Sequence, residues 1–84
     1  MKFAIALMDT HENELYHFQN LSEQAESPTG AVLRFVAQNQ TKLFGESNGN
    51  YVPFVEKVSA TTTVEELVEE LSTWDFIASI IEIK

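Results

Sequence analysis

The sequence predicts one α+β domain, a two-layer sandwich in which two helices cover one face of a mixed or antiparallel β-sheet. The chain has 84 residues, room for one core, and at 44% hydrophobic content it is too apolar for a disordered protein. Two segments space their apolar residues as helices do, each behind a capping signal. The remaining apolar runs are short and have the composition of strands.

The N-terminal segment Lys2–Met8 predicts a strand, because large apolar residues alternate with alanine and methionine over strand length. A polar cluster at residues 9–13 predicts a turn. Glu14–Gln19 then permits two interpretations. Tyr16 and Phe18 favour a strand that returns as a hairpin, which we prefer. The spacing of Leu15, Phe18, Leu21 and Ala25 also fits a helix.

Ser27-Pro28 predicts a helix start, because serine can cap and proline suits the first helical position. Val32, Phe35 and Val36 follow at helical spacing, and Leu43 continues the pattern beyond a polar break at Asn39. Gly45 can end the helix. The prediction is a helix from Pro28 to about Gln40, with an extension to Phe44 as the alternative.

The dipeptide Asn48-Gly49 is typical of a hairpin turn. We therefore predict a strand at Tyr51–Val58, with Val52, Phe54 and Val58 on one face. Because Pro53 cannot donate a hydrogen bond, this would be an edge strand or contain a bulge. Thr41–Glu46 is the candidate partner strand, in competition with the end of the preceding helix.

Thr61–Leu71 predicts the second helix, with Val64, Leu67, Val68 and Leu71 on one stripe. Its start has two equivalent registers, since Thr62 with Glu65 and Thr63 with Glu66 both fit a capping box. The opposite stripe consists of four glutamates: Glu65, Glu66, Glu69 and Glu70. The sequence between Val58 and Ile83 contains no lysine or arginine, so this stripe is acidic throughout.

Trp74-Asp75 predicts a turn into a last strand, Phe76–Ile83, whose two faces are both mostly apolar. This pattern indicates a central strand. The predicted order is β-β-α-β-α-β. If Glu14–Gln19 is instead a helix, the order becomes β-α-β-β-α-β, which resembles a ferredoxin-like layout.

The net charge of −8 is unevenly distributed along the chain. Residues 1–57 hold seven acids and four bases, and residues 58–84 hold six acids and one base. This balance disfavours direct binding to nucleic acid or to an anionic membrane, and it favours a basic protein partner. The absence of cysteine fits a reducing compartment. The apolar run Phe3–Met8 is too short for a signal peptide, so we expect a soluble, cytoplasmic protein.

Residue types that could support catalysis or metal binding cluster only around His11, near Asp9, Glu12, Glu14 and His17. Two histidines without cysteines make a poor set of metal ligands, and a solvated loop explains the cluster as well. Nucleophile-elbow and phosphate-binding motifs are absent from the sequence. The carboxylates of the acidic stripe lie on a face expected to be wet, where acid catalysis is disfavoured. We expect no enzyme activity, no cofactor and no metal.

The sequence thus predicts a small non-enzymatic binding module. Its candidate partner-binding residues are Glu65, Glu66, Glu69, Glu70, Trp74 and Tyr51. The acidic stripe also has the form of an ordinary solvated face, and Trp74 and Tyr51 also suit a core. In size, acidity and lack of catalytic motifs the chain resembles phage-encoded inhibitors of bacterial defence, such as anti-CRISPR proteins, which implies occupation of a basic, nucleic-acid-binding site. The alternative is a ferredoxin-like domain that senses a small molecule or forms a homodimer through a sheet edge such as Tyr51–Val58.

Overall fold

The computed structural model describes residues 2–11, 14–20, 26–45 and 49–83. Its elements follow the order β-β-α-α-α-α-β. They are β1 (Lys2–Asp9), β2 (Glu14–Asn20), α1 (Pro28–Gln38), α2 (Gln40–Phe44), α3 (Tyr51–Ser59), α4 (Val64–Thr73) and β3 (Phe76–Ile83). The α+β class is therefore confirmed, whereas both predicted element orders are wrong.

The three strands form one antiparallel sheet in the order β2-β1-β3. The strand predicted at Lys2–Met8 and the hairpin strand predicted at Glu14–Gln19 are both confirmed, and the helical interpretation of the second segment is wrong. The prediction that Phe76–Ile83 is the central strand is also wrong. The central position belongs to β1, and β3 lies at an edge.

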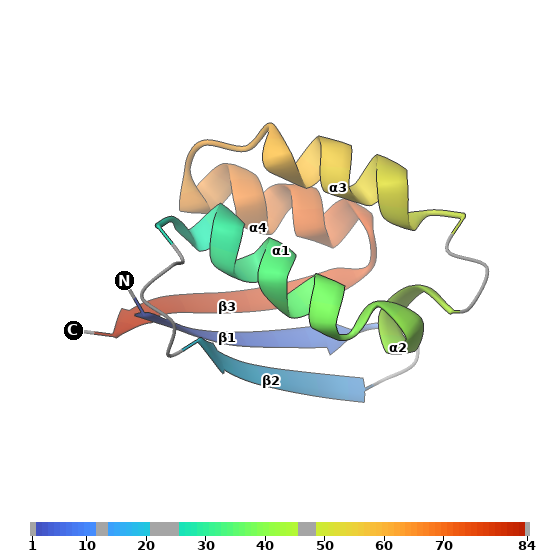
Figure 1. Cartoon of the computed structure of the whole chain (residues 1–84), viewed down its shortest axis with the longest axis horizontal. Helices are drawn as coiled ribbons and strands as arrows, with labels where there is room; N and C mark the ends of the chain where they lie inside the picture. Colours follow the sequence, from blue (N-terminus) through green and yellow to red (C-terminus); the bar gives the residue numbers. More distant parts are fainter. Residues whose placement is uncertain (1, 12–13, 21–25, 46–48, 84) are drawn as a thin grey trace.

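The helices lie on one face of this sheet (Figure 1). α1 contacts β1 and β2, α4 contacts β3, and α3 rests on α1 and α4. Phe3, Ile5 and Leu7 of β1 point into this layer and are fully buried. They meet the apolar stripes of the helices, which include Val32 and Phe35 of α1 and several residues of α3 and α4: Phe54, Val58, Leu67 and Leu71.

The start of α1 follows the sequence signals. The Oγ of Ser27 accepts a hydrogen bond from the backbone N–H of Gly30 at 3.0 Å, and Pro28 occupies the first turn. The helix is shorter than predicted because Asn39, the polar break in the pattern, leaves helical backbone angles at φ −118° and ψ 25°. The chain continues as the short helix α2, which ends at Gly45 with φ 76°. The strand considered for Thr41–Glu46 is therefore wrong over its described residues, and Glu46 lies outside them.

The strand predicted at Tyr51–Val58 is wrong, because this segment forms α3. Pro53 lies in the first turn of α3, where its missing N–H costs nothing. Phe54 and Val58, one helical turn apart, are both fully buried, whereas Val52 is 63% exposed. No hairpin therefore follows Asn48-Gly49, of which Asn48 lies outside the described residues.

Candidate partner-binding surfaces

The acidic stripe lies on α4 and faces away from the core. Leu67 and Leu71 are buried beneath the helix, while Glu65, Glu66 and Glu69 are exposed. Glu70 is half-buried. The helix begins after Thr63, so the second of the two predicted capping registers is correct.

Glu66 completes the capping box of α4. Its Oε1 accepts hydrogen bonds from the backbone N–H groups of Thr62 and Thr63, at 3.0 and 3.2 Å, and from the Thr62 hydroxyl at 2.7 Å. In return the Glu66 N–H donates to the Thr63 hydroxyl at 3.1 Å. These bonds, first of all the one from the Thr62 hydroxyl, favour the charged form and lower the pKa of Glu66. Glu66 therefore stabilises the helix start as well as carrying charge.

Glu70 has a structural role at the other end of α4. Its Oε2 accepts hydrogen bonds from the indole N–H of Trp74 at 3.1 Å and from the Thr73 hydroxyl at 2.8 Å. Trp74 is half-buried and packs edge-on against Phe54, with 5.4 Å between the ring centroids. This packing favours the interpretation of Trp74 as a core residue over that of an interface anchor.

Tyr51, the other aromatic candidate, stands at the first turn of α3 and is half-buried. Its ring packs edge-on against Phe44 of α2 at 5.7 Å. Tyr51 and Trp74 thus flank the same aromatic cluster, which also contains Phe54 and Phe76. The sequence does not indicate that Tyr51 and Trp74 share this cluster, because the cluster is formed by contacts between distant segments.

The acidic stripe has a basic neighbour that the α4 sequence alone does not show. Lys57 of α3 lines a shallow groove of about 360 Å³ together with Glu66, Glu69 and Glu70. This lysine moderates the charge on the side of α4 that faces α3. Glu65 and Glu69 are exposed, and no hydrogen bond within the described residues engages their carboxylates. They are the two members of the stripe most available to a partner.

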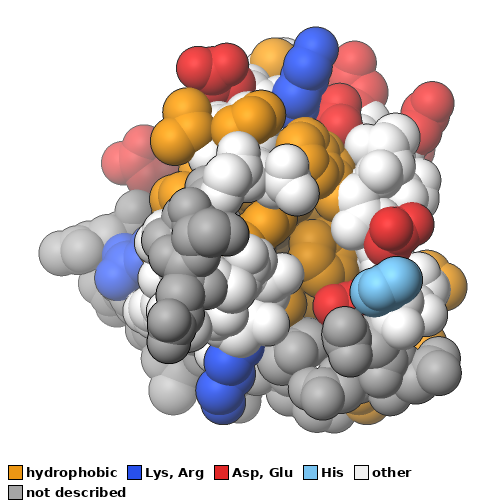
Figure 2. Space-filling model, turned by 90° about the vertical axis from the view of Figure 1, so that its right-hand side faces the viewer, with side chains coloured by type: hydrophobic (Ala, Val, Ile, Leu, Met, Phe, Trp, Pro, Cys, Tyr) orange, Lys and Arg blue, Asp and Glu red, His pale blue; other side chains and the backbone are white. Residues whose placement is uncertain are grey.

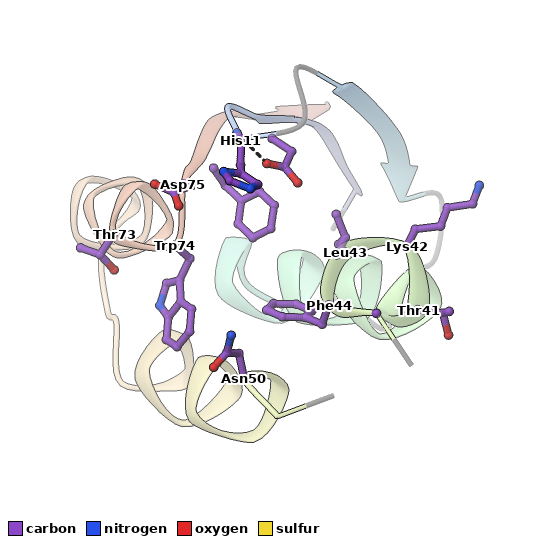
Figure 3. A pocket seen from close by; sticks show the side chains of 12 residues that line it. His11, Thr41, Lys42, Leu43, Phe44, Asn50, Thr73, Trp74 and Asp75 are labelled. Carbon is purple, nitrogen blue, oxygen red and sulfur yellow. Dashed lines mark hydrogen bonds between the residues drawn. The ribbon is translucent and has the colours of Figure 1, made fainter. Parts of the chain in front are cut away.

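A depression of about 790 Å³ opens where α2, α3 and the α4–β3 turn meet. Figure 2 shows apolar side chains at its bottom and acidic side chains and a histidine at its border. Phe44 and Trp74 lie on two sides of the depression, with Asn50 between them and His11 across from them (Figure 3). Aromatic walls with a few polar groups can hold a small apolar molecule or a partner's side chain.

Backbone groups of Thr10, His11 and Asp75 form hydrogen bonds along the polar side of this depression. The buried carboxylate of Asp9 accepts a hydrogen bond from the N–H of His11 at 2.9 Å. The Asp75 carbonyl accepts bonds from both the N–H and the hydroxyl of Thr10, at 2.9 and 3.0 Å. Within the described residues no group of three or more histidine, aspartate or glutamate side chains could hold a metal ion. The side chain of His17 and all of Glu12 lie outside what the structure describes.

The sheet face opposite the helices was not among the predicted sites. Among the described residues it carries four exposed large apolar side chains: Met8 (41% exposed), Leu15 (52%), Ile77 (60%) and Ile81 (60%). Met8 pairs with Leu15 on one side and with Ile77 on the other, so three of them form a row across the sheet. The sequence of β3 is apolar on both faces, a pattern that predicts a strand buried on both sides; in the structure one of these faces is exposed.

Within the described residues, no helix combines the length and the apolar character that a membrane span requires. Comparison with protein-family models found no match. No similar curated protein and no similar solved structure was found either.

Proposed function

We propose that the protein is a small, non-enzymatic binding module that docks the acidic face of α4 onto a basic surface of another protein. Where that surface normally holds nucleic acid, docking would make the protein a competitive inhibitor, in the manner of phage-encoded inhibitors of bacterial defence. One observation carries the proposal: α4 holds four carboxylates on one helix, and hydrogen bonds to two of them, Glu66 and Glu70, fix its two ends.

The fixed ends matter because binding costs less when the charged groups are already ordered. Glu66 and Glu70 form hydrogen bonds at the two ends of α4, and Glu65 and Glu69, one helical turn apart, are exposed. Attraction between this face and a basic partner would also speed the encounter. The supporting role of Trp74 and Tyr51 is then to anchor α3 and α4, and only their exposed atoms would contact a partner.

The test changes the exposed pair, Glu65 and Glu69, and keeps Glu66 and Glu70, whose hydrogen bonds fix the helix ends. We expect the variant Glu65→Gln/Glu69→Gln to fold normally and to lose most binding of the partner captured from host lysate at about 50 mM salt. The wild-type protein should release the same partner at about 500 mM salt, because screening shortens the reach of surface charges. Binding strength is measured by quantitative pull-down followed by titration of the purified partner.

The matched control is Glu26→Gln/Glu56→Gln, which changes two exposed glutamates outside α4 and shifts the net charge equally, from −8 to −6. This variant should retain the partner. A partner that both double variants bind as tightly as the wild type, at both salt concentrations, would refute docking by α4.

The alternative function, a ferredoxin-like sensing or oligomerisation domain, loses the layout that suggested it, because α3 replaces the predicted third strand. Among the described residues, the depression beside Trp74 is a candidate small-molecule site. Oligomerisation does not depend on the ferredoxin-like layout.

A further inference from the structure

The outer edge of β3 is built to accept another strand. β3 is eight residues long, contains no proline or lysine, and pairs with β1 without a bulge along its whole length. In the described part of the chain no strand covers its other edge. Proteins normally protect such a long apolar edge with charges, proline or bulges, because it readily pairs with another strand.

The alternation of hydrogen-bonded and non-hydrogen-bonded pairs between β1 and β3 shows which backbone groups of β3 face its outer edge. The Thr10 N–H donates to the Asp75 carbonyl at 2.9 Å, and this pair continues the β1–β3 register by one residue. In an antiparallel ladder, hydrogen-bonded and non-hydrogen-bonded pairs alternate. The backbone groups that turn away from β1 therefore belong to every second residue of β3: Phe76, Ala78, Ile80 and Glu82.

These four residues are complementary to their own copies. When two β3 strands run antiparallel about a twofold axis at Ser79, Ala78 lies opposite the second copy's Ile80, and Phe76 lies opposite its Glu82. Every pair that must exchange hydrogen bonds then joins two residues whose backbone groups face the edge. Sliding the strands by one residue in either direction pairs edge-facing residues with residues already bonded to β1.

The same register brings together the most exposed apolar side chains of the outer sheet face. Ile77 comes to lie directly opposite the second copy's Ile81, and Ile81 opposite its Ile77. These are non-hydrogen-bonded pairs, in which the side chains approach most closely. Ile77 and Ile81 are each 60% exposed in the single chain. The backbone permits this register and those shifted by two residues, and the pairing of Ile77 with Ile81 selects this one among them.

We propose that the protein forms a homodimer in which the β3 edges of two copies pair antiparallel about Ser79, making one six-stranded sheet. The partner is a second copy of this chain because the edge and its isoleucines fit each other. The pairing uses no carboxylate of α4, so this proposal and the proposed function can fail separately. One strand edge is about 26 Å long at 3.3 Å per residue, so the interface is small and we expect micromolar dissociation.

The experiment is sedimentation equilibrium over a concentration series, in which the mass rises from 9.5 kDa toward twice that value. The decisive variants are Ile77→Lys/Ile81→Lys, which places lysine opposite lysine twice, and Ile77→Lys/Ile81→Glu, which places lysine opposite glutamate twice. We expect the first to raise Kd at least about a hundredfold, and the second to dimerise at least about tenfold more tightly than the first.

Net charge works against this expected ranking, which makes the comparison stringent. The lysine–lysine variant has net charge −6 and the lysine–glutamate variant −8, as in the wild type. Repulsion between whole molecules alone would therefore favour the lysine–lysine dimer. For the same reason salt should strengthen the wild-type dimer, opposite to its effect on docking by α4.

The control Val52→Lys introduces the same residue at a 63% exposed site on α3, and it should leave Kd within about twofold of the wild type. Circular dichroism confirms that each variant is folded. A wild-type chain that stays monomeric up to about 1 mM would overturn the homodimer. A lysine–glutamate variant no tighter than the lysine–lysine variant would overturn the register.

Discussion

Helices α3 and α4 lie side by side, yet they form for different physical reasons. α4 begins at a complete capping box between Thr63 and Glu66, with a second acidic residue, Glu65, in its first turn. α3 begins after Asn50, whose side chain makes no capping hydrogen bond, and its first turn contains Pro53. Both helices bury two large apolar residues one turn apart. α4 is thus supported locally and by packing, whereas α3 depends mainly on packing.

This difference explains why one helix was predicted and the other was not. Tyrosine, valine and phenylalanine favour strands in isolation, but tertiary contacts override such preferences. Phe54 is the centre of those contacts: its ring lies 5.0 Å from Phe44, 5.4 Å from Trp74 and 6.2 Å from Phe76. A strand would also put Phe54 and Val58 on one face, but together with Val52. The helix buries Phe54 and Val58 and leaves Val52 63% exposed, so the segment is a helix despite its weak helix propensity.

The largest expected effect comes from removing the packing of α3. Phe54→Ala should lower the free energy of unfolding by about 3–5 kcal/mol, because it leaves a cavity in the aromatic cluster. The control Val52→Ala, on the exposed side of the same helix, should change it by less than about 0.5 kcal/mol. Urea denaturation followed by circular dichroism measures both. Equal effects of the two variants would show that α3 does not depend on its buried stripe.

A smaller effect is expected at the local support of α4. Thr63→Ala removes the hydroxyl that accepts from the Glu66 N–H, and should cost about 0.5–2 kcal/mol of stability. Thr63→Ser keeps the oxygen and should lie close to the wild type. The same urea denaturation measures these variants. A Thr63→Ala protein as stable as the wild type would mean that packing alone fixes α4, and the contrast with α3 would disappear.

The smallest effect is the pH dependence of the capping box. Hydrogen bonds from Thr62 and Thr63 lower the pKa of Glu66 below its ordinary value of 4.5 in the folded chain. Its contribution to stability is therefore complete above the unfolded-state pKa and is lost as pH falls through the lower folded-state pKa. The stability advantage of wild type over Glu66→Gln should be present at pH 7 and shrink toward about pH 3.

The control for that measurement is Glu65→Gln, which removes one charge from the same turn without removing a capping hydrogen bond. Its change in stability measures the effect of removing one negative charge from the first turn of α4, and this effect is subtracted from that of Glu66→Gln. An advantage over Glu66→Gln that stays constant between the two pH values, after this correction, would contradict the role of the Glu66 carboxylate in the cap.

The surfaces differ in how far the sequence reveals them. The acidic face of α4 follows from the spacing of four glutamates, which local helix geometry is enough to place. The sequence could not show that Lys57 lies beside three of them, because that position depends on the packing of α3 against α4. The outer edge of β3 could not be found at all while β3 was predicted to be central, since the apolar pattern of a strand does not reveal its place in the sheet.

By itself, the sequence determined the elements whose signals lie within a few residues. Ser27 with Pro28 starts α1, Gly45 ends α2, and the capping box starts α4. Only the tertiary structure decided that Tyr51–Ser59 is a helix and that β1, not β3, occupies the centre of the sheet. The physical reason is range: caps and turns are hydrogen bonds between near neighbours, whereas strand order and the burial of Phe54 depend on contacts between distant segments.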